Sequence, residues 1–253
     1  VPVVLAGKRC KVPVIIHESD MTPGLANKIA IPSAVKVCCN FPETLDSLPK
    51  GKAVLTGSPI RQELLSGNKI AAMDMCGFTA DKPVILVIGG SLGSVIVNNA
   101  VRKSLPRLLE KFQIIHLCGK GKTDDSLNDT KGYCQFEYIR DELRDIFALA
   151  DIVISRAGAN AICELLALRK PNLLIPLSAK ASRGDQILNA RSFERQGFSM
   201  VIEEEDLTEE TLVSSVLDLY ENRGSYIDAM RNSDQQDSID TIISLIEESA
   251  SGK

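Results

Sequence analysis

A short glycine-rich segment, residues 89–94, has the sequence Gly-Gly-Ser-Leu-Gly-Ser and follows the apolar run Val84–Ile88. Glycines let a backbone turn tightly and approach a ligand closely. A helix-period segment comes next, and the free N–H groups and positive dipole end of such a helix suit a diphosphate. The segment is neither the six-residue dinucleotide fingerprint nor a P-loop, which ends in Gly-Lys-Ser/Thr. By itself it fits either a phosphate site, to which Ser91 would add a hydroxyl donor, or a simple tight turn.

A carboxylate occupies a comparable place after a second apolar run. Glu164 lies in the second turn of a predicted helix that begins soon after Asp151–Ser155. Ligands of open α/β sheets bind at the carboxyl ends of strands, and a carboxylate can accept hydrogen bonds from both hydroxyls of a ribose. The alternatives are a solvated helix glutamate or a favourable charge near a helix N-terminus.

A third polar cluster follows the apolar run Asn172–Ile175. Asp185, Gln186 and Asn189 lie on the first turns of a predicted helix. Amides and a carboxylate suit sugar hydroxyls, which both donate and accept hydrogen bonds. Helix capping by Asp185 is the alternative. Taken in order, the three clusters could bind phosphate, ribose and sugar at successive strand ends.

The elements that must position these clusters follow from apolar runs that alternate with helix-period segments. Most runs are almost continuously apolar, which is typical of strands buried on both faces of a parallel sheet. The β-α-β-α order predicts a doubly wound α/β fold. The predicted strands are Val12–His17, Ala34–Asn40, Ala53–Thr56, Val84–Ile88, Gln113–Cys118, Cys134–Tyr138, Asp151–Ser155, Asn172–Ile175 and Ser199–Ile202, and the predicted helices include Ser94–Lys111, Asp141–Ala150, Ala159–Leu168 and Gln186–Gln196.

The carboxyl end is predicted to carry two more helices. Four isoleucines of the last one fall at helical spacing and form a single apolar stripe. We expect this stripe to pack onto the body of the protein, because Glu247 and Glu248 would be repelled by an anionic membrane. The four residues are Ile239, Ile242, Ile243 and Ile246.

Composition narrows the class of protein. The chain has 253 residues, of which 44% are hydrophobic and 25% charged, and its net charge is -4. This acidic balance does not predict nucleic-acid binding, for which a basic face is expected. The seven cysteines form no Cys-x-x-Cys pattern and there are two histidines, so we expect buried free thiols in a reducing compartment and no zinc site. No Asp-x-Asp sequence and no apolar run of membrane-spanning length occurs, and we predict neither a metal nor another cofactor.

A turn-rich break at Thr56-Gly57-Ser58-Pro59 predicts a domain boundary. Before it, residues 1–56 supply too few strands to bury a good parallel-sheet core. We therefore expect 1–56 to be part of an incomplete amino-terminal domain, 57–225 to be a complete carboxyl-terminal domain, and 226–253 to be a carboxyl-terminal helix. The opening Val1-Pro2-Val3-Val4, which has no methionine, suggests the middle of a longer protein.

In combination, these motifs resemble the MurG family, the transferases that add N-acetylglucosamine to a lipid-linked muramyl-pentapeptide in bacterial cell-wall synthesis. The resemblance covers nearly the whole chain, in the family's order. It is carried by His17-Glu18-Ser19-Asp20, Gly24-Leu25-Ala26-Asn27-Lys28, Gly57-Ser58-Pro59-Ile60-Arg61, Gly89-Gly90-Ser91-Leu92-Gly93, Gly119-Lys120-Gly121, Tyr138-Ile139, Arg156-Ala157-Gly158-Ala159 with Glu164, and Gly184-Asp185-Gln186-Ile187-Leu188-Asn189-Ala190.

The resemblance implies two Rossmann-like domains of the GT-B glycosyltransferase type. The first, residues 1–56, would be the acceptor-side domain and is incomplete here, and the second, residues 57–225, would bind the UDP-sugar donor, UDP-N-acetylglucosamine. It assigns the diphosphate to the glycine loop, the uracil to the Ile139 backbone and the ribose to Glu164. Family members often have paired glutamines where this chain has Asp185-Gln186. The implied substrate-binding set is Asn27, Arg61, Gly90, Ser91, Gly93, Asn98, Ile139, Gly158, Ala159, Glu164, Asp185, Gln186 and Asn189.

The resemblance also implies the reaction. Glu18 and Asp20 would be catalytic residues in the transfer of N-acetylglucosamine, with inversion, to a lipid-linked acceptor. This transfer converts lipid I to lipid II. It implies a cytoplasmic enzyme that is peripheral on the inner face of the bacterial membrane through an amino-terminal part absent here. We expect the 253 residues alone to have little activity. The alternatives are a nucleotide-sugar-binding fragment without activity and a UDP-N-acetylglucosamine epimerase of related fold.

Overall fold

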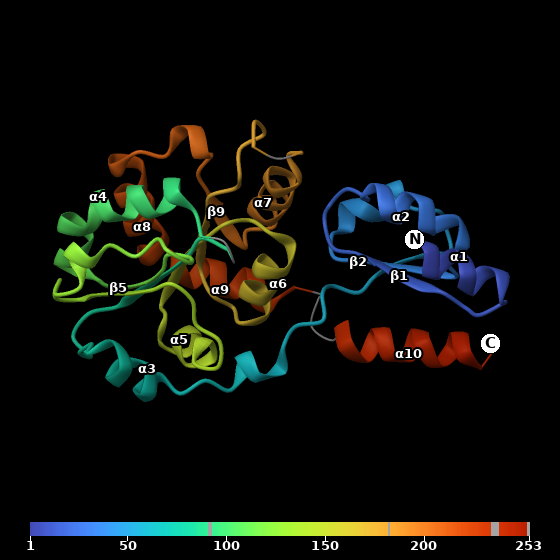
Figure 1. Ribbon diagram of the computed structural model, residues 1–253, viewed down its shortest axis with the longest axis horizontal. Coiled ribbons are helices and arrows are strands. Elements are labelled where there is room, and N and C mark those ends of the chain that lie inside the picture. The colour runs from blue at the N-terminus through green and yellow to red at the C-terminus, as the bar shows by residue number, and fades with distance from the viewer. Residues whose placement is uncertain (91–92, 182, 234–237, 252–253) are drawn as a thin grey trace. The chain divides into compact units, whose positions relative to one another are not determined.

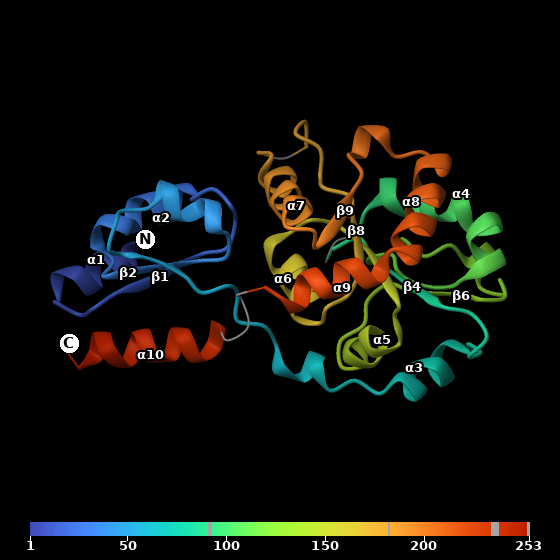
Figure 2. The same ribbon diagram turned by 180° about the vertical axis from the view of Figure 1, so that it is seen from behind.

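The computed structural model describes residues 1–90, 93–181, 183–233 and 238–251. The chain divides into two compact units, one of residues 1–60 with 233–253 and the other of residues 61–232. The unit boundaries fall at 60/61 and 232/233, whereas the turn signals of the sequence fall near 56–59. Figures 1 and 2 show the two units from opposite sides.

The larger unit, 61–232, contains a six-stranded sheet in which every pair of neighbouring strands is parallel. Its spatial order is β6-β5-β4-β7-β8-β9. All six predicted strands of this unit are confirmed. Their bounds are β4 Val84–Ile88, β5 Gln113–Leu117, β6 Tyr133–Phe136, β7 Ile152–Ser155, β8 Asn172–Leu174 and β9 Ser199–Val201.

Helices cover both faces of this sheet, as a doubly wound fold requires. One apolar cluster joins alternate residues of the strands, such as Ile85, Val87 and Ile114, to Val97 and Val216 on two helices. In Figure 1 these two helices, α4 and α8, lie above the sheet, and α5 and α3 lie below it. The helices are α3 Lys69–Cys76, α4 Val95–Lys111, α5 Leu143–Leu149, α6 Ala159–Ala167, α7 Asp185–Arg195, α8 Glu209–Glu221 and α9 Arg223–Arg231.

The strand order of the larger unit reverses between β4 and β7. From β4 the chain passes through α4 to β5 on one side, and from β7 it passes through α6 to β8 on the other. Ligands of doubly wound sheets bind outside the carboxyl ends of the strands at this reversal. The glycine loop after β4 and the loop after β7 therefore flank the place where a ligand is expected.

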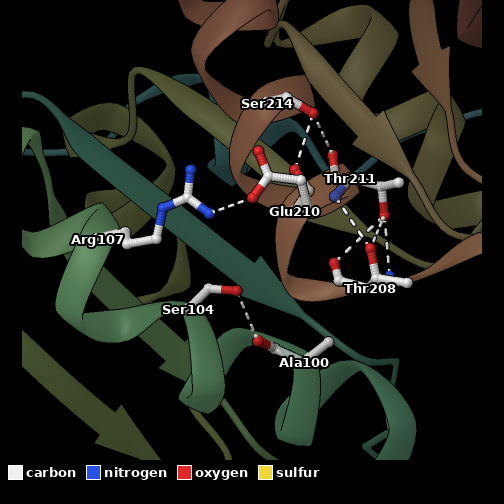
Figure 3. Close-up of polar contacts among 7 residues, drawn as sticks. All are labelled: Ala100, Ser104, Arg107, Thr208, Glu210, Thr211 and Ser214. Atoms are coloured by element: carbon white, nitrogen blue, oxygen red, sulfur yellow. Dashed lines mark hydrogen bonds and ion pairs between the residues drawn. The ribbon is translucent and has the colours of Figure 1, made fainter.

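Helix α8 begins with a reciprocal cap and is joined to α4 by an ion pair (Figure 3). The Thr208 hydroxyl accepts a hydrogen bond from the Thr211 N–H at 3.1 Å, and the Thr211 hydroxyl accepts one from the Thr208 N–H at 2.9 Å. Arg107 of α4 donates to Glu210 of α8 at 2.6 Å. The ion pair is solvent-exposed, so the cap and the apolar contact between the helices contribute more to stability.

Replacing Thr208 by alanine removes the acceptor for the Thr211 N–H. We expect the free energy of unfolding to fall by about 1 kcal/mol, which is the usual value of an N-cap. Urea denaturation followed by circular dichroism measures this change. Thr208→Ser keeps the hydroxyl and should retain most of the stability; an equal loss in both variants would show that the hydroxyl is not the cause.

The smaller unit contains three parallel strands in the order β1-β2-β3. Its core joins Ile16, Val37 and Cys39 of the strands to Ala30 and Leu48 outside them. All three strands predicted in this part of the chain are confirmed. The elements are α1 Pro2–Arg9, β1 Ile15–Glu18, α2 Leu25–Ala30, β2 Lys36–Cys39, β3 Ala53–Leu55 and α10 Ser238–Ala250.

The isoleucine stripe of α10 is only partly covered. Ile239 and Ile242 are half-buried, but Ile243 is 47% exposed and Ile246 is 52% exposed. The prediction that all four pack as one stripe is therefore wrong. The covered face of α10 includes Ser238 as well as Ile239 and Ile242. Ser238 is buried, and its hydroxyl donates a hydrogen bond to the carbonyl of Ser58 at 2.9 Å.

Two further properties concern the described residues as a whole. The seven cysteines carry free thiols, and Cys38, Cys39, Cys118 and Cys163 are buried. In the portion of the chain that the structure describes, no helix is long and apolar enough to cross a membrane.

Candidate functional site

The glycine loop lies at the carboxyl end of β4, and its geometry requires glycine at three positions. Gly90 and Gly93 have φ values of +84° and +68°, which side chains other than glycine's rarely tolerate. A Cβ atom on Gly89 would lie 2.6 Å from the Ser94 nitrogen, and one on Gly93 would lie 2.0 Å from the Cys118 carbonyl oxygen. Gly90 faces open space, which leaves room for a ligand. Ser91, assigned to the diphosphate by resemblance, lies outside the described residues.

Helix α4 begins directly after this loop. Ser94 is its N-cap, and the Ser94 hydroxyl accepts a hydrogen bond from the Val97 N–H at 3.3 Å. The helix is 17 residues long, so its positive dipole end is well developed at the loop. Asn98, in the second turn, is 1% exposed, and its amide bonds the Cys118 carbonyl and His116.

A buried arginine stands on the other side of the strand reversal. Arg156, directly after β7, donates to the carbonyls of Ile175 and Pro176 at 3.0 and 3.1 Å and to the Ser94 hydroxyl at 2.6 Å. It also forms an ion pair with Glu204, and both side chains are buried. Arg156 thus fixes the N-cap of α4 to the loop after β8. The sequence motif around Arg156 does not predict this role, because the partners of the arginine lie 19 to 62 residues away in the chain.

Glu164 of α6 is paired with Arg61. The Nε and Nη2 atoms of Arg61 both donate to Oε1 of Glu164, at 3.3 and 3.1 Å. Among the described residues none is hydrogen-bonded to Oε2. The Arg61 and Glu164 side chains are 50% and 20% exposed. Arg61 thus holds the carboxylate in one orientation through one of its two oxygens.

The loops after β6 and β7 contribute backbone. Ile139 is buried in the loop after β6, between the exposed Tyr138 and Arg140, whose guanidinium lies over the Tyr138 ring. Gly158 is the N-cap of α6 and has no atom near the place where a Cβ would be, so a ligand could approach it closely. Ala159, the first residue of α6, is buried.

The third polar cluster lies on the first turns of α7. Gln186 accepts a hydrogen bond from the Leu177 N–H at 3.1 Å, and Asn189 is fully buried and donates to the Ala157 carbonyl at 3.3 Å. Asp185 is paired with Arg183 at 3.2 Å. Gln186 and Asn189 thus connect α7 to the loops after β8 and β7, while Asp185 lies nearer to solvent.

Glu18, Asp20 and Asn27 belong to the smaller unit, and Glu18 bonds both of the others. The Glu18 carboxylate is buried and accepts hydrogen bonds from the backbone N–H of Asp20 at 3.1 Å, the backbone N–H of Gly24 at 2.9 Å and Asn27 Nδ2 at 2.9 Å. Asn27 also donates to the His17 carbonyl at 3.0 Å. Glu18 therefore orders the turn that carries Asp20.

The charge near the glycine loop is positive. Lys122 extends from the loop after β5 and donates through Nζ to the Gly93 carbonyl at 3.1 Å. His116, fully buried in β5, is neutral, because burial lowers its pKa to about 3. No group of three or more His, Cys, Asp or Glu residues that could hold a metal ion occurs within the described ranges. The site can thus bind an anion through a helix N-terminus, with a lysine beside it.

Comparison with known proteins identifies the class. The family model "Glycosyltransferase family 28 C-terminal domain" matches residues 84–245, so the chain belongs to a class of glycosyltransferases. A crystal structure of Acinetobacter baumannii MurG superposes with a TM-score of 0.73 at 24% identity, over 98% of this chain and 70% of that one. A putative UDP-N-acetylglucosamine 2-epimerase from Listeria monocytogenes gives 0.72 at 12% identity, over 99% and 71%. These two likenesses concern the fold, which is of the GT-B type with parallel sheets.

Curated relatives narrow the class further. The chain is 68% identical, over 99% of its length and 71% of the relative's, to the UDP-N-acetylglucosamine--N-acetylmuramyl-(pentapeptide) pyrophosphoryl-undecaprenol N-acetylglucosamine transferase of Lachnospira eligens. It is 69% identical to the enzyme of the same name from Lachnoclostridium phytofermentans, over 98% and 70%. The chain belongs to this transferase family, the MurG family.

Proposed function

We propose that this chain binds UDP-N-acetylglucosamine and takes part in transferring N-acetylglucosamine to lipid-linked muramyl-pentapeptide, the step from lipid I to lipid II in peptidoglycan synthesis. The observation that carries the proposal is the 68% identity over 99% of the chain to a relative named for this transfer. An arrangement of loops suited to a nucleotide-sugar, at the strand reversal of the larger unit, supports it.

For the donor we propose one role for each loop. The diphosphate lies against Gly90, Gly93 and the N-terminus of α4, where the dipole and N–H groups stabilise the charge that develops as UDP leaves. Lys122 adds a positive charge beside Gly93. Glu164 accepts the ribose hydroxyls through the oxygen that Arg61 does not bond. The Ile139 backbone meets the uracil, and residues of the Gly158–Ala159 turn and of α7, including Asp185 and Gln186, lie near the sugar.

For the chemistry we propose an inverting displacement. The acceptor hydroxyl attacks the anomeric carbon from the face opposite UDP, and a carboxylate removes its proton. Glu18 and Asp20, both in the smaller unit, are the two candidates for this base, and Glu18 accepts three N–H hydrogen bonds that hold it in one orientation.

The epimerase alternative is less well supported, since the relatives with high identity are named as transferases and the epimerase likeness is at 12% identity. The relatives are longer than this chain, which covers 71% of the first of them. We propose that donor binding, rather than turnover, is the activity that the chain shows in isolation. We also propose that contact with the lipid acceptor takes place at the cytoplasmic face of the membrane.

Donor binding is tested by replacing Glu164 with glutamine. The amide keeps the shape of the side chain but removes the charge that accepts the ribose hydroxyls. We expect the Kd for UDP, measured by isothermal titration calorimetry, to rise about 10- to 100-fold, the equivalent of a lost charged hydrogen bond or two. The rise should be smaller for 2′-deoxy-UDP, which lacks one of the two hydroxyls.

Glu221→Gln is a matched control, because Glu221 is an exposed glutamate at the end of α8. Its Kd for UDP should be unchanged. Equal losses for UDP and 2′-deoxy-UDP in Glu164→Gln would contradict a bidentate ribose contact. Failure of the unsubstituted chain to bind UDP would contradict the proposed function, and conversion of UDP-N-acetylglucosamine without any acceptor would favour an epimerase.

A further inference from the structure

Three buried polar side chains form a hydrogen-bonded chain behind the glycine loop. His116 lies in β5, Tyr133 in β6 and Asn98 on α4, and they are 0%, 5% and 1% exposed. Nδ1 of His116 is 2.9 Å from the Tyr133 hydroxyl, and Nε2 is 3.0 Å from Oδ1 of Asn98. Nδ2 of Asn98 continues the chain to the Cys118 carbonyl at 2.9 Å.

The direction of each hydrogen bond follows from its acceptor. A carbonyl can only accept, so the NH₂ group of Asn98 faces Cys118 and its oxygen faces His116. Nε2 of His116 must therefore carry a proton. Burial keeps the imidazole neutral by lowering its pKa to about 3, and burial also raises the pKa of Tyr133. Nδ1 is then an acceptor for the Tyr133 hydroxyl, and all the donors point from Tyr133 toward Cys118.

The Cys118 carbonyl, at the end of this series of hydrogen bonds, lies against Gly93 of the glycine loop. A Cβ on Gly93 would lie 2.0 Å from the Cys118 oxygen and 2.8 Å from the Gly119 Cα. Lys122, from the same loop after β5, donates to the Gly93 carbonyl at 3.1 Å. Gly93 thus packs directly against the backbone of Cys118 and Gly119. Asn98, on α4, holds that backbone in place through its hydrogen bond to the Cys118 carbonyl.

We propose that Asn98, His116 and Tyr133 are positioning residues that hold Gly93, at the end of the glycine loop, and the N-terminus of α4 in the arrangement that binds a nucleoside diphosphate. They do so without touching the ligand, since both ends of the Asn98 amide are engaged inside the protein. The inference rests on the proposed function, in which this loop binds the diphosphate of UDP. It gives Asn98 a role behind the ligand rather than in contact with it.

The test compares UDP with uridine, which has no phosphate, in the Asn98→Ala variant. We expect the Kd for UDP to rise about tenfold or more, the scale of one badly placed charged hydrogen bond, while the Kd for uridine stays the same. Asn99→Ala is the matched control, because Asn99 is the next residue of α4 and is exposed; it should alter neither Kd. Calorimetry is done well below the unfolding temperature of each variant.

Tyr133→Phe provides a milder second variant should Asn98→Ala not fold, because it removes only the hydroxyl that donates to His116. It should raise the Kd for UDP severalfold and leave that for uridine unchanged. An unchanged Kd for UDP in the folded variants, or equal losses for UDP and uridine, would overturn the positioning role while leaving the proposed function intact. If the unsubstituted chain binds uridine but gains nothing from the phosphates, the proposed diphosphate site and this inference both fail.

Discussion

Replacing Gly93 by alanine is expected to abolish measurable UDP binding and to lower the free energy of unfolding by about 3 kcal/mol or more, the sum of a left-handed backbone penalty and a steric clash. Gly93 has a φ of +68°, and an added Cβ would lie 2.0 Å from the carbonyl oxygen of Cys118. That oxygen belongs to backbone held by Asn98. Either the backbone at Gly93 or the loop after β5 must move, and Gly93 is part of the proposed diphosphate site.

Gly77→Ala separates the clash from the backbone penalty. Gly77 has a φ of +63° at the end of α3, but nothing lies within 4 Å of the place where its Cβ would be. This variant should lose about 1 kcal/mol of stability, from the left-handed conformation alone, and should bind UDP normally. Urea denaturation and calorimetry measure the two effects. Similar losses in both variants would mean that the contact with Cys118 does not matter.

The sequence predicts the strands of both sheets well, because a strand that is buried on both faces is a continuous run of apolar residues. All nine predicted strands occur among the described residues, since runs such as Val84–Ile88 are apolar throughout and buried except at the last residue. Strand ends are less certain. The predicted strand Val12–His17 is observed as Ile15–Glu18. Residues 12–14 are outside the strand, and they include Pro13, which cannot donate a hydrogen bond to a neighbouring strand.

The site was predictable as far as it depends on loops that follow strands. The glycine loop, Glu164 and the α7 cluster all lie at carboxyl ends of strands in the larger unit, where the βαβ pattern predicts them. The partner of Glu164 was not predictable from pattern alone, because Arg61 is 103 residues away in the chain. Roles that depend on such distant partners leave no local signal.

The roles of polar side chains that turn inward are the hardest to predict from the sequence. Asn98 is next to the glycine loop in the sequence and resembles a ligand contact, yet the phase of α4 directs it toward His116. His116 is a polar residue between the apolar residues Ile115 and Leu117 of β5, and its partners come from two other elements. The prediction for the isoleucine stripe of α10 is wrong for a related reason. Helical spacing defines a face of the helix but does not predict how much of that face is covered.

Arg156→Met is expected to lower the free energy of unfolding by about 3–5 kcal/mol, the cost of leaving one member of a buried ion pair without its partner. Arg156 and Glu204 are 10% and 9% exposed, and Arg156 also bonds the carbonyls of Ile175 and Pro176 and the hydroxyl of Ser94. Because Ser94 caps α4, the Kd for UDP should rise as well. Urea denaturation measures the first effect and calorimetry the second.

Two further variants identify the cause of this loss. Arg191→Met removes an arginine that also has two carboxylate partners, Glu194 and Glu203, but is 40% exposed, so the cost should be below about 1 kcal/mol. The double variant Arg156→Met/Glu204→Met removes the stranded carboxylate and should regain part of the stability lost in Arg156→Met. It should not regain UDP affinity, because the hydrogen bonds from Arg156 to Ser94 and to the loop after β8 are still missing. Recovery of both properties would mean that the uncompensated charge of Glu204, and not the lost support of the α4 N-cap, had weakened UDP binding.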